Sequence, residues 1–170
     1  TESEPAVAAE RLNVLERANL FLTPLDLTRE WFRYHPLFAE LLQRRLLDTE
    51  GPAVVAELHL RAARWYHQAG EAVEAIHHAM AARDWPTAAE MMAFWGTEFF
   101  KTGAMGTYLP MLKALPEEEL RRHPQLIQDL GWVLALTHDL EQADQYLRLA
   151  ETAQPASPDF MGETLTGRAY

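Results

Sequence analysis

The sequence contains no cysteine among its 170 residues. This absence excludes a disulfide scaffold, a thiolate metal site and a cysteine nucleophile, and it agrees with a reducing cytoplasm. The chain also has no apolar run near the roughly 20 residues that a membrane helix needs. Its first residues, TESEPAVAAE, are acidic and polar, unlike a secretory signal peptide. We therefore expect a cytoplasmic location and no membrane partner.

Basic residues are scarce, with 15 Lys and Arg against 25 Asp and Glu, and the formal net charge is −10. Nucleic-acid binding depends on a basic surface that releases counterions from the phosphates. The adjacent basic pairs, Arg44–Arg45 and Arg121–Arg122, stand beside apolar residues in helical patterns, so we interpret them as solvent-facing. We expect that this chain does not hold DNA itself.

The sequence also lacks the common motifs of enzyme sites. It contains no GxxxxGK[ST], GxGxxG, GxSxG or HExxH. The two serines, Ser3 and Ser157, stand in loop-like flanks, which argues against a serine nucleophile. The carboxylates follow the solvent faces of predicted helices. These observations predict that the chain is not an enzyme and has no catalytic residues.

Four of the seven histidines gather on two consecutive predicted helices: His59, His67, His77 and His78. Glu74 precedes His78 by four residues, a spacing that a metal site can use. Because cysteine and HExxH are absent, we interpret these histidines as solvent-facing or interhelical and expect no metal site.

The stretch Leu20–Leu42, LFLTPLDLTREWFRYHPLFAELL, departs from the helical pattern of the other segments. Leu20–Leu25 and Glu30–His35 alternate in polarity and include several aromatic residues, which favours two strands of about six residues each. Asp26–Arg29 between them predicts a polar turn. Pro36 suits the first position of a helix, because the N–H that it lacks would be unpaired there.

Apolar residues elsewhere recur at helical spacing. A short helix is predicted from Glu10, and the helix from Pro36 should end in DTEGP, at residues 48–52. The later helices are predicted over residues 52–69, 71–83, 84–101, 107–115, 124–137 and 140–152, with a single turn at 116–120. Gly70 and Gly103 should end two of them in the left-handed conformation, and Asp84 and Thr107 should act as N-caps.

Two helical pairs share small residues at fixed spacing followed by a large aromatic: WYHQAGEAVEAIHHAMAARD and GWVLALTHDLEQADQYLRLA. Such a pattern is typical of tetratricopeptide-like stacks, in which each pair buries its face against its neighbours. His138 stands in the second pair where Gly70 stands in the first. The predicted fold is therefore mainly α, with a short β-hairpin followed by antiparallel helical pairs in a TPR-like superhelix.

The large aromatic residues leave two interpretations open. They could line a concave ligand groove, which stacked helical repeats provide, or they could pack between the helices. We favour core packing for most of them, and expect partial exposure for Trp85, which precedes Pro86 next to a cap. The residues concerned are Trp31, Trp65, Trp85, Trp95, Trp132, Tyr66, Tyr108 and Tyr146.

The segments NLFLTPLDLTREWFRYHPLFAELLQRRL and VAELHLRAARWYHQAGEAVEAIHHAMAARDWPTAAEMM resemble the large ATP-dependent LuxR-type transcriptional regulators, the MalT-like group within the STAND class of signal-transduction NTPases. The resemblance covers about residues 10–153, and RYHPLFAELL ends its most specific part. It implies a fragment: residues 1–50 would be the C-terminal part of a winged-helix domain, and residues 51–170 a TPR-like helical repeat region, truncated at its C-terminus.

The resemblance also implies a role for His35. In STAND proteins a winged-helix histidine lies against the β-phosphate of bound ADP, and His35 in Tyr34-His35-Pro36 matches that position. ATP or ADP would then be a cofactor of the full-length protein and not of this fragment. A helix N-terminus favours an anion, although His35 could instead be a plain N-cap. The turn at Asp26–Arg29 is less polar than the resemblance leads us to expect, and His138 replaces a glycine.

Two functions follow as hypotheses. The first is a non-catalytic regulatory or sensor segment that couples a nucleotide-binding switch to an inducer- or partner-binding helical arm. Its partners would be its own nucleotide-binding domain and a small-molecule inducer or protein effector, with DNA bound only through an absent C-terminal domain. The alternative is a TPR-like protein–protein interaction scaffold with no nucleotide link. The inducer and self-association are left open.

Overall fold

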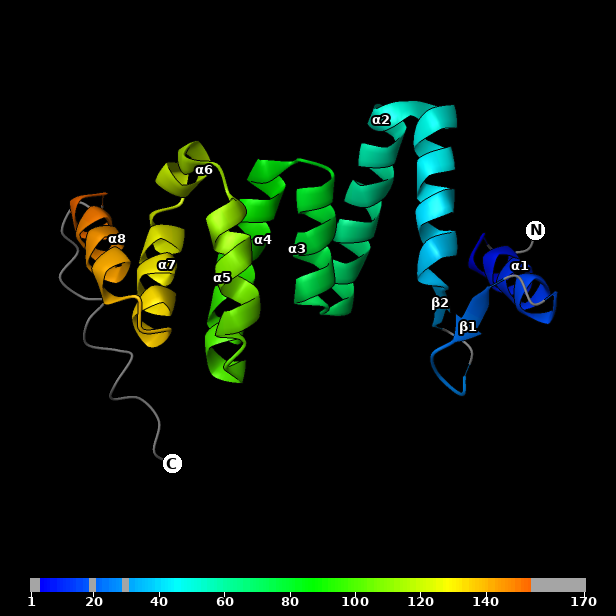
Figure 1. The fold of residues 1–170 in the computed structure, drawn as a ribbon, viewed down its shortest axis with the longest axis horizontal. Coiled ribbons are helices and arrows are strands. Elements are labelled where there is room, and N and C mark those ends of the chain that lie inside the picture. The colour runs from blue at the N-terminus through cyan, green and yellow to red at the C-terminus, as the bar shows by residue number, and fades with distance from the viewer. Residues whose placement is uncertain (1–3, 19–20, 29–30, 154–170) are drawn as a thin grey trace. The chain divides into compact units, whose positions relative to one another are not determined.

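The structure is a computed structural model that describes residues 4–18, 21–28 and 31–153. Within these residues the chain forms eight helices and two strands (Figure 1), which confirms the predicted fold class of a mainly α protein with a short β-hairpin. The chain divides into two compact units, Thr1–Val55 and Ala56–Tyr170. None of the described helices has the length and apolar character needed to cross a membrane. The elements are α1 (Glu4–Arg17), β1 (Leu22–Pro24), β2 (Phe32–Tyr34), α2 (Pro36–Ala69), α3 (Ala72–Ala81), α4 (Trp85–Thr102), α5 (Met105–Ala114), α6 (Glu117–Arg122), α7 (Pro124–Leu136) and α8 (Leu140–Ala153).

The first unit contains an antiparallel hairpin in which Leu22 pairs with Tyr34 and Pro24 with Phe32. Each strand has three residues, so the predicted length of about six was wrong. Two features shorten the ladder: Phe21 has a positive φ of 56°, which is incompatible with a strand, and the backbone bends after Pro24. The predicted alternation is confirmed in β2, where Phe32 and Tyr34 are half-buried and Arg33 is exposed.

Helix α2 is interrupted at Gly51, where φ is 80° and ψ is 169°. This conformation is essentially restricted to glycine, because a Cβ would clash with the backbone. Pro52 follows it and begins the second half of α2, where a missing N–H costs little. The prediction that residues 48–52 end one helix and open another is therefore confirmed.

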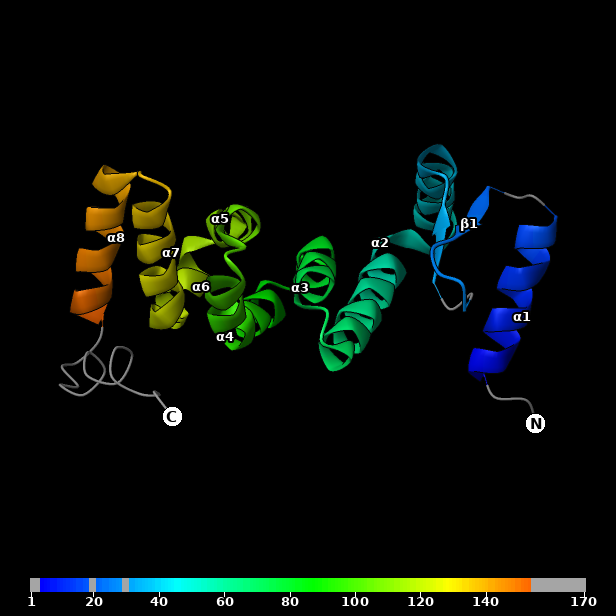
Figure 2. The same ribbon diagram turned by 90° about the horizontal axis from the view of Figure 1, so that it is seen from below.

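The second unit has a continuous hydrophobic core from α2 to α8, and Figure 1 and Figure 2 both show α7 and α8 side by side. The apolar spacing in the second half of α2 predicts a buried face of five residues: Val54, Leu58, Ala62, Trp65 and Tyr66. This prediction was wrong for Val54, Leu58 and Trp65, which are exposed, whereas Ala62 and Tyr66 are half-buried. Leu58 and Trp65 are 39% and 53% exposed, whereas Ala63 is fully buried. A small side chain at the contact lets helices approach closely, and it contributes little to a hydropathy pattern. The largest fully buried side chains are Tyr108, Ile76, Met92, Leu112, Leu126, Ile127, Leu130, Leu134 and Val133.

The predicted N-caps differ in outcome. The Asp84 carboxylate accepts a hydrogen bond from the N–H of Thr87 at 3.1 Å, so this cap is confirmed. Thr107 is not a cap, because α5 begins two residues earlier, at Met105, after Ala104. The predicted single turn at residues 116–120 is the six-residue helix α6.

Candidate functional site

His35 lies at the junction of β2 and α2, directly before Pro36. Its backbone N–H donates a hydrogen bond to the carbonyl of Phe21 at 2.7 Å, which extends the hairpin by one residue pair. Its carbonyl accepts hydrogen bonds from the N–H groups of Phe38 and Ala39, both at 2.9 Å. The backbone of His35 is thus fixed on both sides by the sheet and the helix, while its side chain is exposed.

The Phe21 ring contacts the His35 imidazole and belongs to a small aromatic cluster with Phe38 and Tyr34. The Phe21 ring meets the imidazole edge-on, with 6.4 Å between centroids, and Phe21 also lies 5.3 Å from Phe38. The Tyr34 ring lies 5.8 Å from the Phe38 ring, centroid to centroid. Aromatic pairs of this kind contribute about 0.5–1.5 kcal/mol each beyond their buried area. These contacts support the uncommon positive φ of Phe21 and restrict where the imidazole points.

The start of α2 offers few backbone donors to an anion. Pro36 has no N–H, and the N–H groups of Phe38 and Ala39 donate to the His35 carbonyl. A phosphate held here would therefore depend on a ring N–H of His35 more than on the helix terminus. His35 occupies the N-cap position, but the described contacts of its ring are aromatic. This geometry is compatible with both roles considered for the residue.

The turn between the strands is ordered by Asp26. Its carboxylate accepts hydrogen bonds from the hydroxyl of Thr28 and from the backbone N–H of Trp31, the latter at 3.0 Å. A single aspartate thus satisfies donors on both sides of the turn, as such residues commonly do. The low polarity of this turn, which we noted in the sequence, does not prevent it from forming. Arg29 and Glu30 lie outside the described residues.

His59 of α2 and His78 of α3 contact each other across the two helices. Their Nδ1 atoms are 2.8 Å apart, and the Tyr66 ring stacks on His78 with centroids 5.4 Å apart. Burial, followed by the charges of His59 and His77, lowers the pKa of His78, whereas Glu74 raises it. The interhelical interpretation is confirmed for this pair. In the described part of the chain, His, Asp and Glu do not form a group of three or more that could hold a metal ion.

The expectation that most tryptophans pack in the core was wrong for several of them. Trp31, Trp65 and Trp132 are 40%, 53% and 48% exposed. Trp95 is half-buried, and its Nε1–H donates a hydrogen bond to Nδ1 of His67 at 3.0 Å. Trp85 is half-buried as predicted.

Ser3 and Ser157, which we considered as nucleophiles, lie outside the described residues.

One buried polar network was missed by the sequence analysis. The hydroxyl of Tyr108 donates to Oδ2 of Asp129 at 2.8 Å and also lies 3.2 Å from the Met92 carbonyl oxygen. Burial raises the pKa of Tyr108 and of Asp129, and the hydrogen bond from Tyr108 partly opposes the rise for Asp129. Asp129 looked like a solvent-face carboxylate in the sequence. The network forms only because α4, α5 and α7 meet there, which no local pattern reveals.

The first unit resembles a known protein family. Residues 3–54 match the family model of the MalT winged helix domain. No solved structure matches the chain. The matched range includes α1, the hairpin, His35 and α2 as far as the break at Gly51. The first unit is thus similar to the winged helix domain of MalT, and this similarity supports a MalT-like regulator of transcription.

Proposed function

We propose that this chain is a non-catalytic regulatory segment of a signal-responsive, MalT-like transcription regulator of the LuxR and STAND type. The winged-helix unit would couple a nucleotide-binding domain to a helical sensor arm, formed by the TPR-like repeats of α2 to α8. The observation that carries this proposal is the match of residues 3–54 to the MalT winged helix domain. His35 lies in that range, directly before α2, and is the residue that we propose contacts the nucleotide.

The contact would be a hydrogen bond from the His35 imidazole to a phosphate oxygen of ADP in the full-length protein. An exposed ring N–H can donate to such an oxygen without losing an internal partner. A switch requires a contact that differs between two states. Binding of ADP through His35 in the resting state, and its loss after an inducer binds the helical arm, would provide that difference. DNA would be bound by another domain, and the protein would be cytoplasmic.

The test uses the full-length regulator with the substitution His35→Ala. A charge-assisted hydrogen bond contributes about 1.5–3 kcal/mol, so affinity for ADP should fall about tenfold or more. The measurements are the amount of ADP that copurifies with the protein and the basal transcription of a reporter. We expect ADP to fall and basal transcription to rise.

Two further variants control this experiment. His77→Ala removes an exposed histidine from α3 in the second unit and should leave ADP retention unchanged. His35→Gln keeps a hydrogen-bond donor at the position and should restore part of the retention. The assignment is wrong if His35→Ala changes neither ADP retention nor basal transcription.

The helical unit also carries an observation that favours the alternative of a protein-binding scaffold. Phe94 on α4 is 67% exposed, and Trp65 on α2 is 53% exposed. Exposed aromatic residues often serve as anchors in protein interfaces. The sequence encoded upstream distinguishes the two functions, because a phosphate-binding loop supports the regulator and its absence supports the scaffold.

A further inference from the structure

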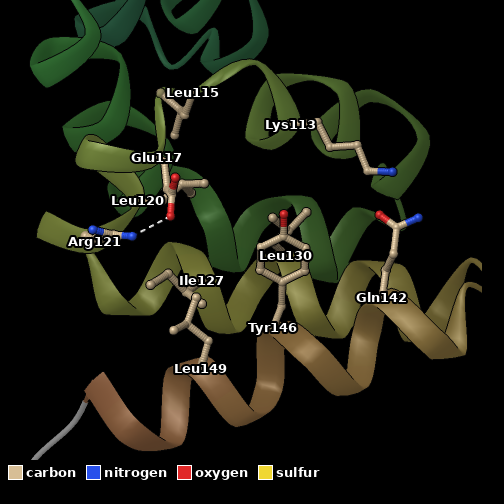
Figure 3. A pocket seen from close by; sticks show the side chains of 10 residues that line it. All are labelled: Lys113, Leu115, Glu117, Leu120, Arg121, Ile127, Leu130, Gln142, Tyr146 and Leu149. Atoms are coloured by element: carbon tan, nitrogen blue, oxygen red, sulfur yellow. Dashed lines mark hydrogen bonds and ion pairs between the residues drawn. The ribbon is translucent and has the colours of Figure 1, made fainter.

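A groove of about 420 Å³ runs between α5, α6, α7 and α8 in the second unit (Figure 3). Its apolar floor comes from four leucine and isoleucine side chains of the core: Leu115, Leu120, Ile127 and Leu130. Leu149 of α8 adds an apolar wall and is 44% exposed. The volume falls in the range of small-molecule sites, which are mostly apolar with a few convergent polar groups.

The two ends of this groove differ in charge. At one end Glu117 and Arg121 of α6 form an ion pair of 2.6 Å, so their charges compensate each other. Figure 3 shows Lys113 of α5 and Gln142 of α8 toward the other end. Within the described residues, the Lys113 ammonium has neither a hydrogen bond nor an ion pair, and it is exposed. An apolar groove with one uncompensated positive charge at its end selects for an anion on an apolar body.

Tyr146 supplies a third feature of the groove. Its half-buried ring points from α8 into the middle of the groove, with the hydroxyl at its tip (Figure 3). Aromatic side chains of this kind offer an apolar face for stacking and a polar tip for a hydrogen bond. Tyr146 thus extends the apolar surface toward the Lys113 end, whereas Leu149 lies on the side of the Glu117–Arg121 pair (Figure 3).

We propose that this groove binds a small amphipathic monoanion. Its aromatic or aliphatic body lies on the leucine floor and against Tyr146, and its carboxylate or sulfonate faces Lys113. The regulatory meaning of this site rests on the proposed function, in which the helical arm senses an inducer. The binding itself rests only on the groove. The Lys113 ammonium would repel a cationic ligand, and it would add no electrostatic attraction to the binding of a neutral ligand.

The test titrates two probes of similar shape into the 170-residue chain. The probes are 8-anilinonaphthalene-1-sulfonate, a monoanion, and N-phenyl-1-naphthylamine, which lacks the sulfonate. The anionic probe should bind more tightly, and salt should weaken its binding by screening the charge. Lys113→Gln should weaken the anionic probe about threefold to fivefold, as expected for an exposed ion pair, and should leave the neutral probe unchanged.

Two pairs of variants locate the site. Lys101→Gln changes an exposed lysine of α4 that pairs with Glu98 at 3.8 Å outside the groove, so it should affect neither probe. Leu149→Ala should weaken both probes. Leu136→Ala, on α7 and 58% exposed but not part of the lining, should weaken neither. Circular dichroism of each variant checks that the fold is retained.

The proposal is overturned if Lys113→Gln leaves the anionic probe unchanged, or if the neutral probe binds as tightly as the anionic one. It is also overturned if Leu136→Ala weakens binding as much as Leu149→Ala. These results are independent of ADP retention in the His35 variants. If the groove does not bind the anionic probe, only the inference about the groove is refuted. If the groove binds the probe but His35→Ala leaves ADP retention unchanged, only the proposed nucleotide link is refuted.

Discussion

At the scale of single residues, Gly96 allows α4 to approach Tyr108 and Asp129. A Cβ added to Gly96 would lie 2.6 Å from Oδ2 of Asp129 and 3.1 Å from the Tyr108 hydroxyl. Gly96→Ala must therefore displace the hydrogen bond between these two side chains. We expect the free energy of unfolding in urea to fall by about 1–2 kcal/mol, since overpacking typically costs about 1–3 kcal/mol and a carboxylate can move slightly.

Gly106 provides the matched control for this substitution. It lies in α5, and a Cβ added there would have no heavy atom within 4 Å. Gly106→Ala should leave stability unchanged or raise it by up to about 1 kcal/mol, because alanine loses less backbone entropy than glycine in a helix. Equal effects of the two substitutions would show that the close approach at Gly96 does not limit stability.

The carboxyl group of Asp129 predicts a pH dependence of stability. Burial raises its pKa in the folded state above the ordinary value of 3.8. The contribution of the protonated Asp129 to the free energy of unfolding is thus fully present below the unfolded-state pKa. It is lost as pH rises through the folded-state pKa. The stability of the native chain relative to Asp129→Asn, which cannot ionise, should therefore decrease as pH rises through that window.

Urea unfolding of both proteins between about pH 3.5 and 7.5 checks this expectation. Tyr108→Phe should extend the window to higher pH, because the hydrogen bond from Tyr108 lowers the pKa of Asp129. A stability difference between the native chain and Asp129→Asn that is constant with pH would contradict the assignment.

At the scale of the elements, four helices end in the same way. The first or second residue after the helix has a positive φ, and the N–H of the residue that follows it bonds back to the carbonyl five residues earlier, as from Asp139 to Leu134 at 2.9 Å. This arrangement is a Schellman motif, in which glycine is preferred because it has no Cβ. Two of the four positions hold glycine and two do not: Gly70, Gly103, Arg83 and His138.

The two non-glycine positions predict stabilising substitutions. A left-handed residue other than glycine costs about 1–2 kcal/mol, partly offset by the greater freedom of glycine in the unfolded chain. His138→Gly should therefore raise the free energy of unfolding by up to about 1 kcal/mol, and Gly70→Ala should lower it by about as much. Thermal and urea unfolding measure both. A destabilised His138→Gly variant would mean that the His138 side chain makes a needed contact.

The same elements show what a sequence pattern can and cannot predict. Five large apolar residues recur at helical spacing over 124–137 and predict a buried face for that helix. All five are buried in α7: Leu126, Ile127, Leu130, Val133 and Leu134. The pattern was only partly right in the second half of α2, because the fully buried position there is the small Ala63. The place of His35 between a strand and a helix was predictable, because alternating aromatic residues and Pro36 are local signals. The Tyr108–Asp129 network was not, because three helices distant in sequence create it.

At the scale of the whole molecule, burial is unevenly divided between the two units. The main core cluster draws its buried members from residues 63–150, all in the second unit. In the described part of the first unit, Leu22 is the one buried hydrophobic residue. Large side chains there are open to solvent, with Leu27 and Leu37 103% and 73% exposed. The two units should therefore differ in their ability to fold alone.

A chain that begins at Pro52 tests this difference. It keeps the whole core cluster and starts at a residue suited to the first turn of a helix. We expect cooperative urea unfolding with a free energy close to that of the full chain, because the deleted residues contribute no side chain to the core cluster. Residues 1–51 alone should unfold without a sharp transition, because a hairpin with so little buried apolar surface is marginally stable. A large loss of stability in the chain from Pro52 would show instead that the first unit completes the core of the second.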